Sequence, residues 1–224
     1  MVQVGSSDSP QEAIGSDRAR FVQDLQELAD LFATKGFRIA YENWAWSTHA
    51  PDWADIWDIC QKVNRPNFGL CLDSFHSAGR EWGDPTTESG MLEDGRSREQ
   101  VIQEWQASCE RLAATVPKEK IFAMQISDAY KLKTPLPKDT SKPHAHWSYD
   151  YRPLPFEGYL PVTDFVNAVL GTGYRGWFSY EIFDSGPDGK GRDYEMEEFA
   201  AGAYRCHDRL IEACKEAKVL EAKL

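Results

Sequence analysis

The sequence predicts an α/β fold in which consecutive βα units build a parallel sheet. Short runs rich in β-branched and aromatic residues alternate with longer amphipathic stretches along the chain, and this alternation is typical of such units. We count five units. No internal repeat or low-complexity linker divides the 224 residues, so we expect residues 1–224 to form one domain.

The first two units occupy the N-terminal part of the chain. A strand is predicted over Val2–Gly5, and the helix after it, about Asp17–Lys35, has apolar residues at spacings of three and four. The second strand is predicted over Phe37–Glu42. Its helix spans about Asp52–Val63, and Pro66 follows as a stop signal.

The last three units contain two long polar segments. The segment after the third strand and the segment after the fourth, up to Pro161, are predicted loops, and loops of that length are usually functional or mobile. The strands and helices are expected in these pairs: Asn67–Asp73 with Arg98–Thr115, Lys120–Ser127 with Val162–Leu170, and Arg175–Phe183 with Tyr194–Ala222.

Composition and charge restrict the partners and the compartment. The formal net charge is -11 and the basic residues are scattered, so we expect no nucleic-acid partner. No window approaches eighteen consecutive apolar residues, and the N-terminus lacks a signal sequence, which predicts a cytoplasmic protein without a membrane partner. The five cysteines show no CxxC spacing, as expected for buried thiols in a reducing compartment. The sequence leaves open whether the protein forms a homo-oligomer.

Polar residues follow four successive strands where each strand ends: Glu42, Asp73, Gln125 and Glu181. The carboxyl ends of parallel strands meet at one edge of a sheet, so we expect these side chains to converge. Three carboxylates and an amide oxygen suit Mg²⁺ or Mn²⁺, with Co²⁺ as a further option. Each acid alone could instead be a helix cap or a solvated loop residue, but four in register favour a shared metal.

Three histidines are candidates for the chemistry. His76 lies three residues after Asp73, in a predicted loop, and we expect it to act as general base or acid. A packing role is the alternative for a single histidine of this kind. His144 and His146 lie in the long segment after the fourth strand and could reach the substrate.

Two further residues are predicted to bind substrate. Arg152 is a candidate clamp for a substrate carboxylate, because a guanidinium meets that group with two parallel hydrogen bonds; a surface arginine is the alternative. Trp44, directly after Glu42, could form a wall of the pocket, although core packing would explain it too.

Several segments resemble the xylose-isomerase-like TIM barrels of the sugar phosphate isomerase and epimerase superfamily. They are RIAYENWAWSTHAPDWADIWDI, RPNFGLCLDSFHSAG, MQISDAY and GWFSYEIF. Within the superfamily, YENWAW and RPNFGLCLDSFH resemble the fungal 3-dehydroshikimate dehydratases of quinate catabolism. The resemblance implies that the chain holds the last five of eight βα units of a TIM barrel, so that three units would be missing before Met1.

The resemblance also implies a site and a reaction. It implies a divalent metal on Glu42, Asp73, Gln125 and Glu181, with His76 as the catalytic histidine. Many epimerases of the superfamily have a histidine where this chain has Gln125, which favours the dehydratase. The expected reaction is the metal-dependent dehydration of 3-dehydroshikimate to protocatechuate, a small-molecule substrate, in which the metal stabilises the enolate.

Three alternatives accompany this hypothesis. In a sugar phosphate isomerase or epimerase, Glu42 and Glu181 would shuttle a proton on a metal-bound ketose. A truncated and catalytically inactive barrel fragment is the second alternative, because the first three units would be absent. The third, an abasic-site endonuclease, needs a His-rich zinc cluster and a basic groove, and five histidines with a net charge of -11 disfavour it.

Overall fold

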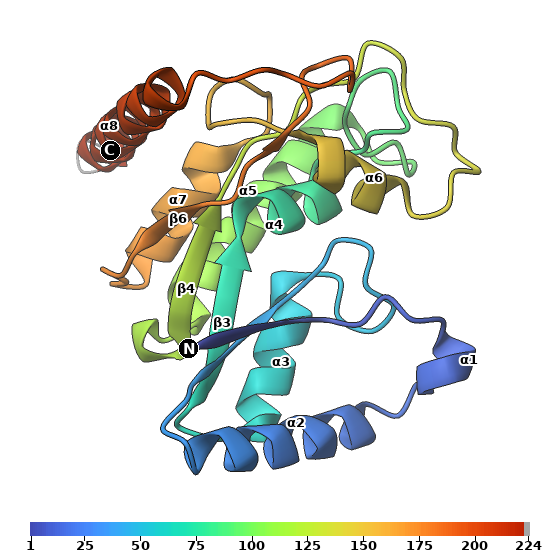
Figure 1. The fold of residues 1–224 in the computed structure, drawn as a ribbon, viewed down its shortest axis with the longest axis vertical. Helices are drawn as coiled ribbons and strands as arrows, with labels where there is room; N and C mark the ends of the chain where they lie inside the picture. Colours follow the sequence, from blue (N-terminus) through green and yellow to red (C-terminus); the bar gives the residue numbers. More distant parts are fainter. Residues whose placement is uncertain (222–224) are drawn as a thin grey trace.

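A computed structural model describes residues 1–221 of the chain. Its main sheet has five strands, all parallel, in the order β1-β2-β3-β4-β6, and helices lie between successive strands of this sheet along the chain (Figure 1). The prediction of five βα units around a parallel sheet is therefore confirmed. The strands are β1 (Val2–Gly5), β2 (Ile39–Glu42), β3 (Phe68–Asp73), β4 (Ile121–Ile126) and β6 (Phe178–Tyr180).

The long helices lie where the apolar periodicity predicted them. They are α2 (Arg18–Ala33), α3 (Trp53–Val63), α5 (Arg98–Thr115), α7 (Val162–Gly171) and α8 (Met196–Glu221). The predicted end of the last helix at Ala222 lies outside the described residues. Short polar side chains determine where the helices begin: Asp17 caps α2, Asp52 caps α3, and Ser97 forms a capping box with Gln100 at α5, satisfying backbone N–H groups that lack partners within the helix.

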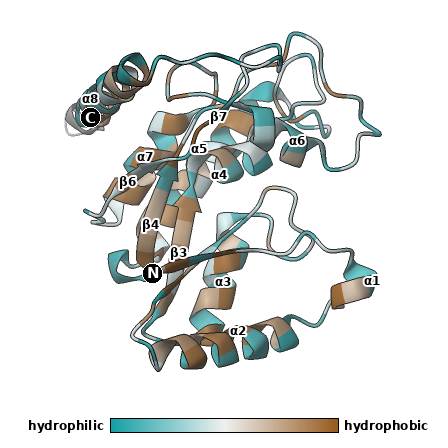
Figure 2. Ribbon diagram, in the orientation of Figure 1, coloured by the Kyte–Doolittle hydropathy of each residue, from teal (hydrophilic) through white to brown (hydrophobic). Residues whose placement is uncertain are grey.

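The core lies between the middle strands and the helices that pack on them. Every residue of β2 and β3 is buried, and Figure 2 shows β3 and β4 mostly in the brown of apolar residues. The largest buried side chains include Trp105, Trp147 and Phe165, which lie on helices. Strands buried on both faces read as continuous apolar runs, which explains why FGLCLD and IFAMQI were recognisable as strands.

Two predicted loops are partly wrong, because each contains a helix. α4 (Ser74–Glu81) begins directly after β3, and α6 (Pro143–Asp150) lies in the second long segment. α4 is short, and its cap, Asp73, was already assigned to the metal site. α6 has no side-chain cap hydrogen bond, so the usual start signal is absent from the sequence. A one-turn helix α1 (Gln11–Ile14) and a 3-10 turn η1 (Lys118–Lys120) were also missed.

The predicted fifth strand is two strands. β6 belongs to the main sheet, whereas β7 (Phe183–Asp184) pairs antiparallel with β5 (Tyr151–Arg152). Glu181 lies between β6 and β7, so the β5–β7 pair forms beside the carboxyl edge of the main sheet. No helix within the described residues is long and apolar enough to cross a membrane.

Candidate metal centre

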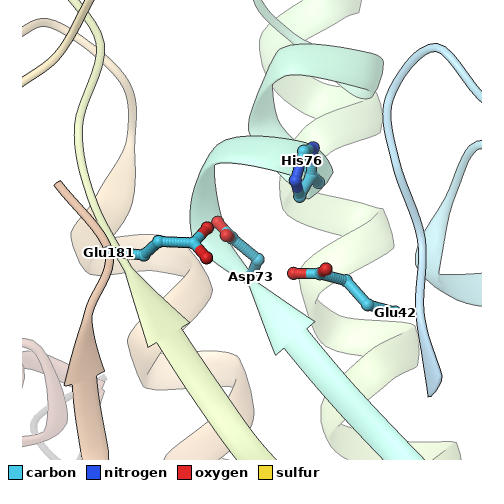
Figure 3. A group of neighbouring side chains, drawn as sticks. All are labelled: Glu42, Asp73, His76 and Glu181. Carbon is cyan, nitrogen blue, oxygen red and sulfur yellow. The ribbon is translucent and has the colours of Figure 1, made fainter. Parts of the chain in front are cut away.

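Three acidic side chains and one imidazole meet at the carboxyl edge of the sheet. Glu42, Asp73, His76 and Glu181 each offer a ligand atom, and these four atoms lie within 4.8 Å of one another. Figure 3 shows the carboxylates of Glu42 and Glu181 approaching Asp73 from two sides, with His76 above. The group could hold a metal ion. Three of its members were predicted as ligands from the strand ends, and His76 joins them from the first turn of α4.

Strand register explains why the acids converge. Glu42 pairs with Cys71, and Asp73 lies two residues further along β3, opposite Gln125. Side chains two residues apart on a strand point to the same face, so these groups share one side of the sheet. The backbone N–H of Glu181 donates to the carbonyl of Ile126 at 3.2 Å, which aligns Glu181 with the end of β4.

Glu42 is held by two donors on one oxygen. Its Oε2 accepts hydrogen bonds from Gln3 Nε2 at 2.7 Å and from the indole N–H of Trp44 at 3.1 Å. The indole can reach this position because residue 5 is glycine: a Cβ atom there would overlap the ring of Trp44. Trp44 therefore contacts a proposed ligand, while its predicted contact with substrate stays a prediction. Gln3 was missed, although its polar side chain between Val2 and Val4 was the signal.

Asp73 is fully buried, and both of its oxygens have partners. Oδ1 accepts from the backbone N–H of Phe75 at 2.6 Å, which caps α4, and Oδ2 accepts from Arg152 Nη2 at 2.6 Å. Burial alone would raise the pKa of this carboxyl, but the charge of Arg152 and its hydrogen bond lower it. Asp73 is therefore ionised at neutral pH.

Gln125 lies beside the acids. Its amide N–H donates to Glu181 Oε1 at 2.8 Å, and its amide oxygen accepts from Gln3 Nε2 at 3.2 Å and from the thiol of Cys71. Burial, together with Glu42 and the other carboxylates, raises the pKa of Cys71, which keeps this thiol protonated as a donor. Ligation of a metal by the amide oxygen of Gln125 stays a prediction.

His76 is a neutral imidazole in this site. The ring is 2% exposed, and burial lowers its pKa to about 3 despite the proximity of Asp73. Its Nδ1 lies 3.4 Å from the backbone N–H of Ala45. A backbone N–H can only donate, so the neutral ring carries its proton on Nε2. The edge-on contact with Trp46, at 5.1 Å between ring centroids, further orients the ring.

The carboxylates carry more negative charge than the protein neutralises. Burial, and then Asp73 and Glu181, raise the pKa of Glu42 to about 8; burial and Asp73 also raise the pKa of Glu181. Like charges in a buried site either bind protons or require a cation. An oxygen-rich donor set with one imidazole fits a divalent metal. Glu42, Asp73 and Glu181 are therefore chemically suitable ligands for such an ion.

Arg152 lies inside the cluster. It is 1% exposed, and it pairs with Glu181 Oε2 at 2.9 Å as well as with Asp73. The alternative of a surface arginine is therefore wrong. The β5–β7 pair brings Arg152 opposite Phe183 and close to Glu181. Binding of a substrate carboxylate by Arg152 stays a prediction.

The two other candidate histidines, His144 and His146, lie on α6. His144 is partly buried next to Trp147 and lies 3.5 Å from the carbonyl of Gly83. His146 is exposed and stacks on Tyr151. The prediction that both lie in a loop is wrong, and contact with substrate stays a prediction for each.

Known proteins resemble this chain in sequence. The chain is 32% identical over 218 residues to the 3-dehydroshikimate dehydratase of Neurospora crassa, which covers 91% of the chain and 58% of that protein. A 3-dehydroshikimate dehydratase of Pseudomonas aeruginosa is 31% identical over 175 residues, 78% of the chain and 22% of that protein. The chain thus spans less than two thirds of the length of either relative.

Solved structures agree with the fold. A xylose isomerase-like TIM barrel/4-hydroxyphenylpyruvate dioxygenase fusion protein matches 99% of the chain and 29% of its own length, with 26% identity and a TM-score of 0.72. An IOLI protein with a bound zinc atom matches 87% of the chain and 56% of its own length, with 21% identity and a TM-score of 0.59. The sequence pattern of the family described as xylose isomerase-like TIM barrel covers residues 1–202. The chain therefore belongs to the xylose isomerase-like TIM barrel family.

Proposed function

We propose that the chain carries the metal centre of a hydro-lyase that removes water from 3-dehydroshikimate to give protocatechuate. The observation that carries the proposal is the convergence of three carboxylates and His76, with ligand atoms within 4.8 Å. It occurs in a chain that is 32% identical to a 3-dehydroshikimate dehydratase of Neurospora crassa. A reaction that leaves a negative charge on a ketone oxygen needs such a centre.

The proposed cofactor is Mg²⁺ or Mn²⁺, with Co²⁺ as a third option. Its ligands would be Glu42, Asp73, Gln125 and Glu181, an all-oxygen set that suits these ions. When bound, the cation would draw electron density from the substrate ketone and stabilise the negative charge that develops on its oxygen.

The proton transfers are assigned to His76 and Glu42. Because the proton of neutral His76 lies on Nε2, this residue can donate to the departing hydroxyl, as neutral imidazoles do in other enzymes. Glu42, whose carboxylate lies in the same cluster, is the proposed base for the proton on the carbon next to the ketone. One proton leaves carbon and one joins the hydroxyl, so the sum is one water, and Glu42 then returns its proton to His76. Glu181 can replace Glu42 as the base.

The remaining proposed contacts concern substrate orientation. 3-Dehydroshikimate has a carboxylate, for which Arg152 is the proposed partner in the cluster. Trp44 is proposed as a wall of the pocket, and His144 and His146 are proposed to approach the substrate from α6. We propose a cytoplasmic protein that acts on a small molecule without nucleic-acid or membrane partners and that could form a homo-oligomer; the net charge of -11 supports the first exclusion.

The test is an assay of the purified chain with 3-dehydroshikimate and Mg²⁺ or Mn²⁺. We expect protocatechuate to appear in the ultraviolet spectrum and a chelator to stop its formation. The Neurospora crassa relative serves as the positive control. The hypothesis would be rejected if the chain binds metal and produces no protocatechuate, but exchanges deuterium from D₂O into a ketose, as the isomerase alternative requires.

A further inference from the structure

Arg152 is a buried cation between two of the acids that are proposed to bind the metal. Its Nη2 lies 2.6 Å from Asp73 Oδ2, and its Nη1 lies 2.9 Å from Glu181 Oε2. An arginine that served only a substrate carboxylate would not need to occupy oxygens of two ligands.

The guanidinium is also held firmly from its other sides. Its Nε donates to Ser127 Oγ at 2.8 Å, and Nη1 lies 3.3 Å from Ser148 Oγ. Its central carbon lies 4.6 Å from the centroid of the Phe75 ring and 5.5 Å from that of Phe183. Hydrogen bonds and two aromatic faces thus fix the charge at this position.

The charges of the cluster balance in a simple way. Three carboxylates contribute three negative charges when ionised, and Arg152 contributes one positive charge, so the cluster carries two negative charges. A divalent cation cancels this remainder. Arg152 therefore offsets one of the three negative charges, and it does so through the carboxylates of two proposed ligands.

We propose that Arg152 is a built-in counter-cation that keeps the metal-free cluster folded and, in return, weakens its affinity for the divalent ion. It occupies lone pairs of Asp73 and Glu181, and its charge repels a second cation in the same cluster. This inference rests on the metal centre of the proposed function but not on the identity of the substrate. A residue that merely orients ligands would instead strengthen metal binding, so the two roles predict effects of opposite sign.

The test is a titration of the metal-free chain with Mn²⁺ alone. Binding is measured by calorimetry or by the electron paramagnetic resonance signal of free Mn²⁺. We expect Arg152→Gln to bind Mn²⁺ more tightly, on the order of tenfold, and Arg152→Lys, which keeps the charge, to stay close to the unchanged chain. Arg96→Gln is the matched control, because Arg96 pairs with Asp94 and Glu104 at the surface; its Mn²⁺ affinity should not change.

Thermal melting gives a second readout for a variant of low stability. In Arg152→Gln the three carboxylates lose their counter-charge, so we expect a lower Tm without metal and a larger rise in Tm with Mn²⁺ than in the unchanged chain. Equal or weaker Mn²⁺ binding by Arg152→Gln, or a smaller rise in Tm, overturns the inference while leaving the proposed dehydratase intact. Failure of the unchanged chain to bind Mn²⁺ overturns both.

Discussion

The middle strands of the sheet and its outer strands contribute to the metal centre in different ways. β2 and β3 are buried along their whole length, and Glu42 and Asp73 at their ends are 2% and 0% exposed. β6 is only partly buried, and the side chain of Glu181 after it is 27% exposed. Gln3, on β1 at the opposite end of the sheet, is exposed as well.

The difference shows two ways of preparing a charged group for a cation. Burial is the first cause of the raised pKa of both Glu42 and Glu181, but it is nearly complete only for Glu42, at the end of a middle strand. At β6, directed contacts from Gln125 and Arg152 hold Glu181 in place. The same substitution should therefore have larger consequences in the middle of the sheet than at its end.

The largest effect is expected for Asp73→Asn. This change removes a ligand charge and leaves Arg152 with only Glu181, and loss of one partner from a buried ion pair costs about 3 kcal/mol of unfolding free energy. Mn²⁺ affinity should fall by about 100-fold or more. Urea unfolding in chelator and calorimetric titration measure the two quantities. Asp188→Asn, which alters an exposed pair with Lys190, is the control, and equal losses in both variants would contradict the comparison.

Glu42→Gln should show how burial controls protonation. Folded Glu42 has a pKa of about 8, above its ordinary value, so the folded state binds this proton more tightly than the unfolded chain does. In chelator, the contribution of Glu42 to stability is present at low pH and is lost as the pH rises to about 8. Glutamine lacks this proton, so the advantage of the variant over the unchanged chain should grow with pH.

The size of this pH effect is expected to be up to about 4 kcal/mol between pH 5 and pH 8.5. Denaturant unfolding of both proteins at the two pH values measures it. His76 is present in both proteins, so its own pH dependence, which has the opposite sign, cancels in the difference. A difference in stability that is independent of pH would mean that burial does not hold a proton on Glu42.

Glu181→Gln should weaken metal binding less than Asp73→Asn does. Glu181 is partly exposed, and Asp73 remains to pair with Arg152, so we expect a loss of about tenfold in Mn²⁺ affinity and little change in unfolding free energy. Titration and urea unfolding, run beside Asp73→Asn, provide the ranking. If Glu181→Gln proves the more damaging change, the outer strand determines the affinity of the site.

Trp44→Phe tests the support of Glu42 with a smaller change. A smaller aromatic ring replaces the indole, and the N–H that donates to Glu42 Oε2 at 3.1 Å is lost. We expect Mn²⁺ binding to weaken by about threefold to tenfold, and a loss of about 1 kcal/mol of unfolding free energy. An unchanged titration curve would assign Trp44 to the pocket wall alone.

The smallest effect is expected for Trp177→Ser. Trp177 lies directly before β6 and is 89% exposed. Substitution of an exposed side chain usually changes the unfolding free energy by less than about 0.5 kcal/mol. Unfolding and Mn²⁺ titration should both match the unchanged chain. A large loss of stability would show that the outer strand is packed against something in solution, for example a second copy of the chain, which sedimentation would detect.

The amino-acid sequence by itself determined the positions of the strands and of the three acids that follow them. Glu42, Asp73 and Glu181 each follow a short run of apolar residues. A buried parallel strand that ends in an acid can be recognised from this sequence pattern alone. The order of the strands follows from consecutive βα units, which place neighbours in sequence next to each other in the sheet. For this reason the edge at which the acids meet was predictable.

Only the tertiary structure decided where Arg152 and Gln3 lie. Arg152 meets Asp73 across 79 residues, and Gln3 meets Gln125 across 122 residues, so no local pattern carries these contacts. His76 faces the acids because Asp73, at the end of β3, also caps α4. Burial decides the charge states, since the pKa of Glu42 and of His76 depends on water excluded by distant parts of the chain. The local periodicity of the sequence therefore does not predict these pKa values.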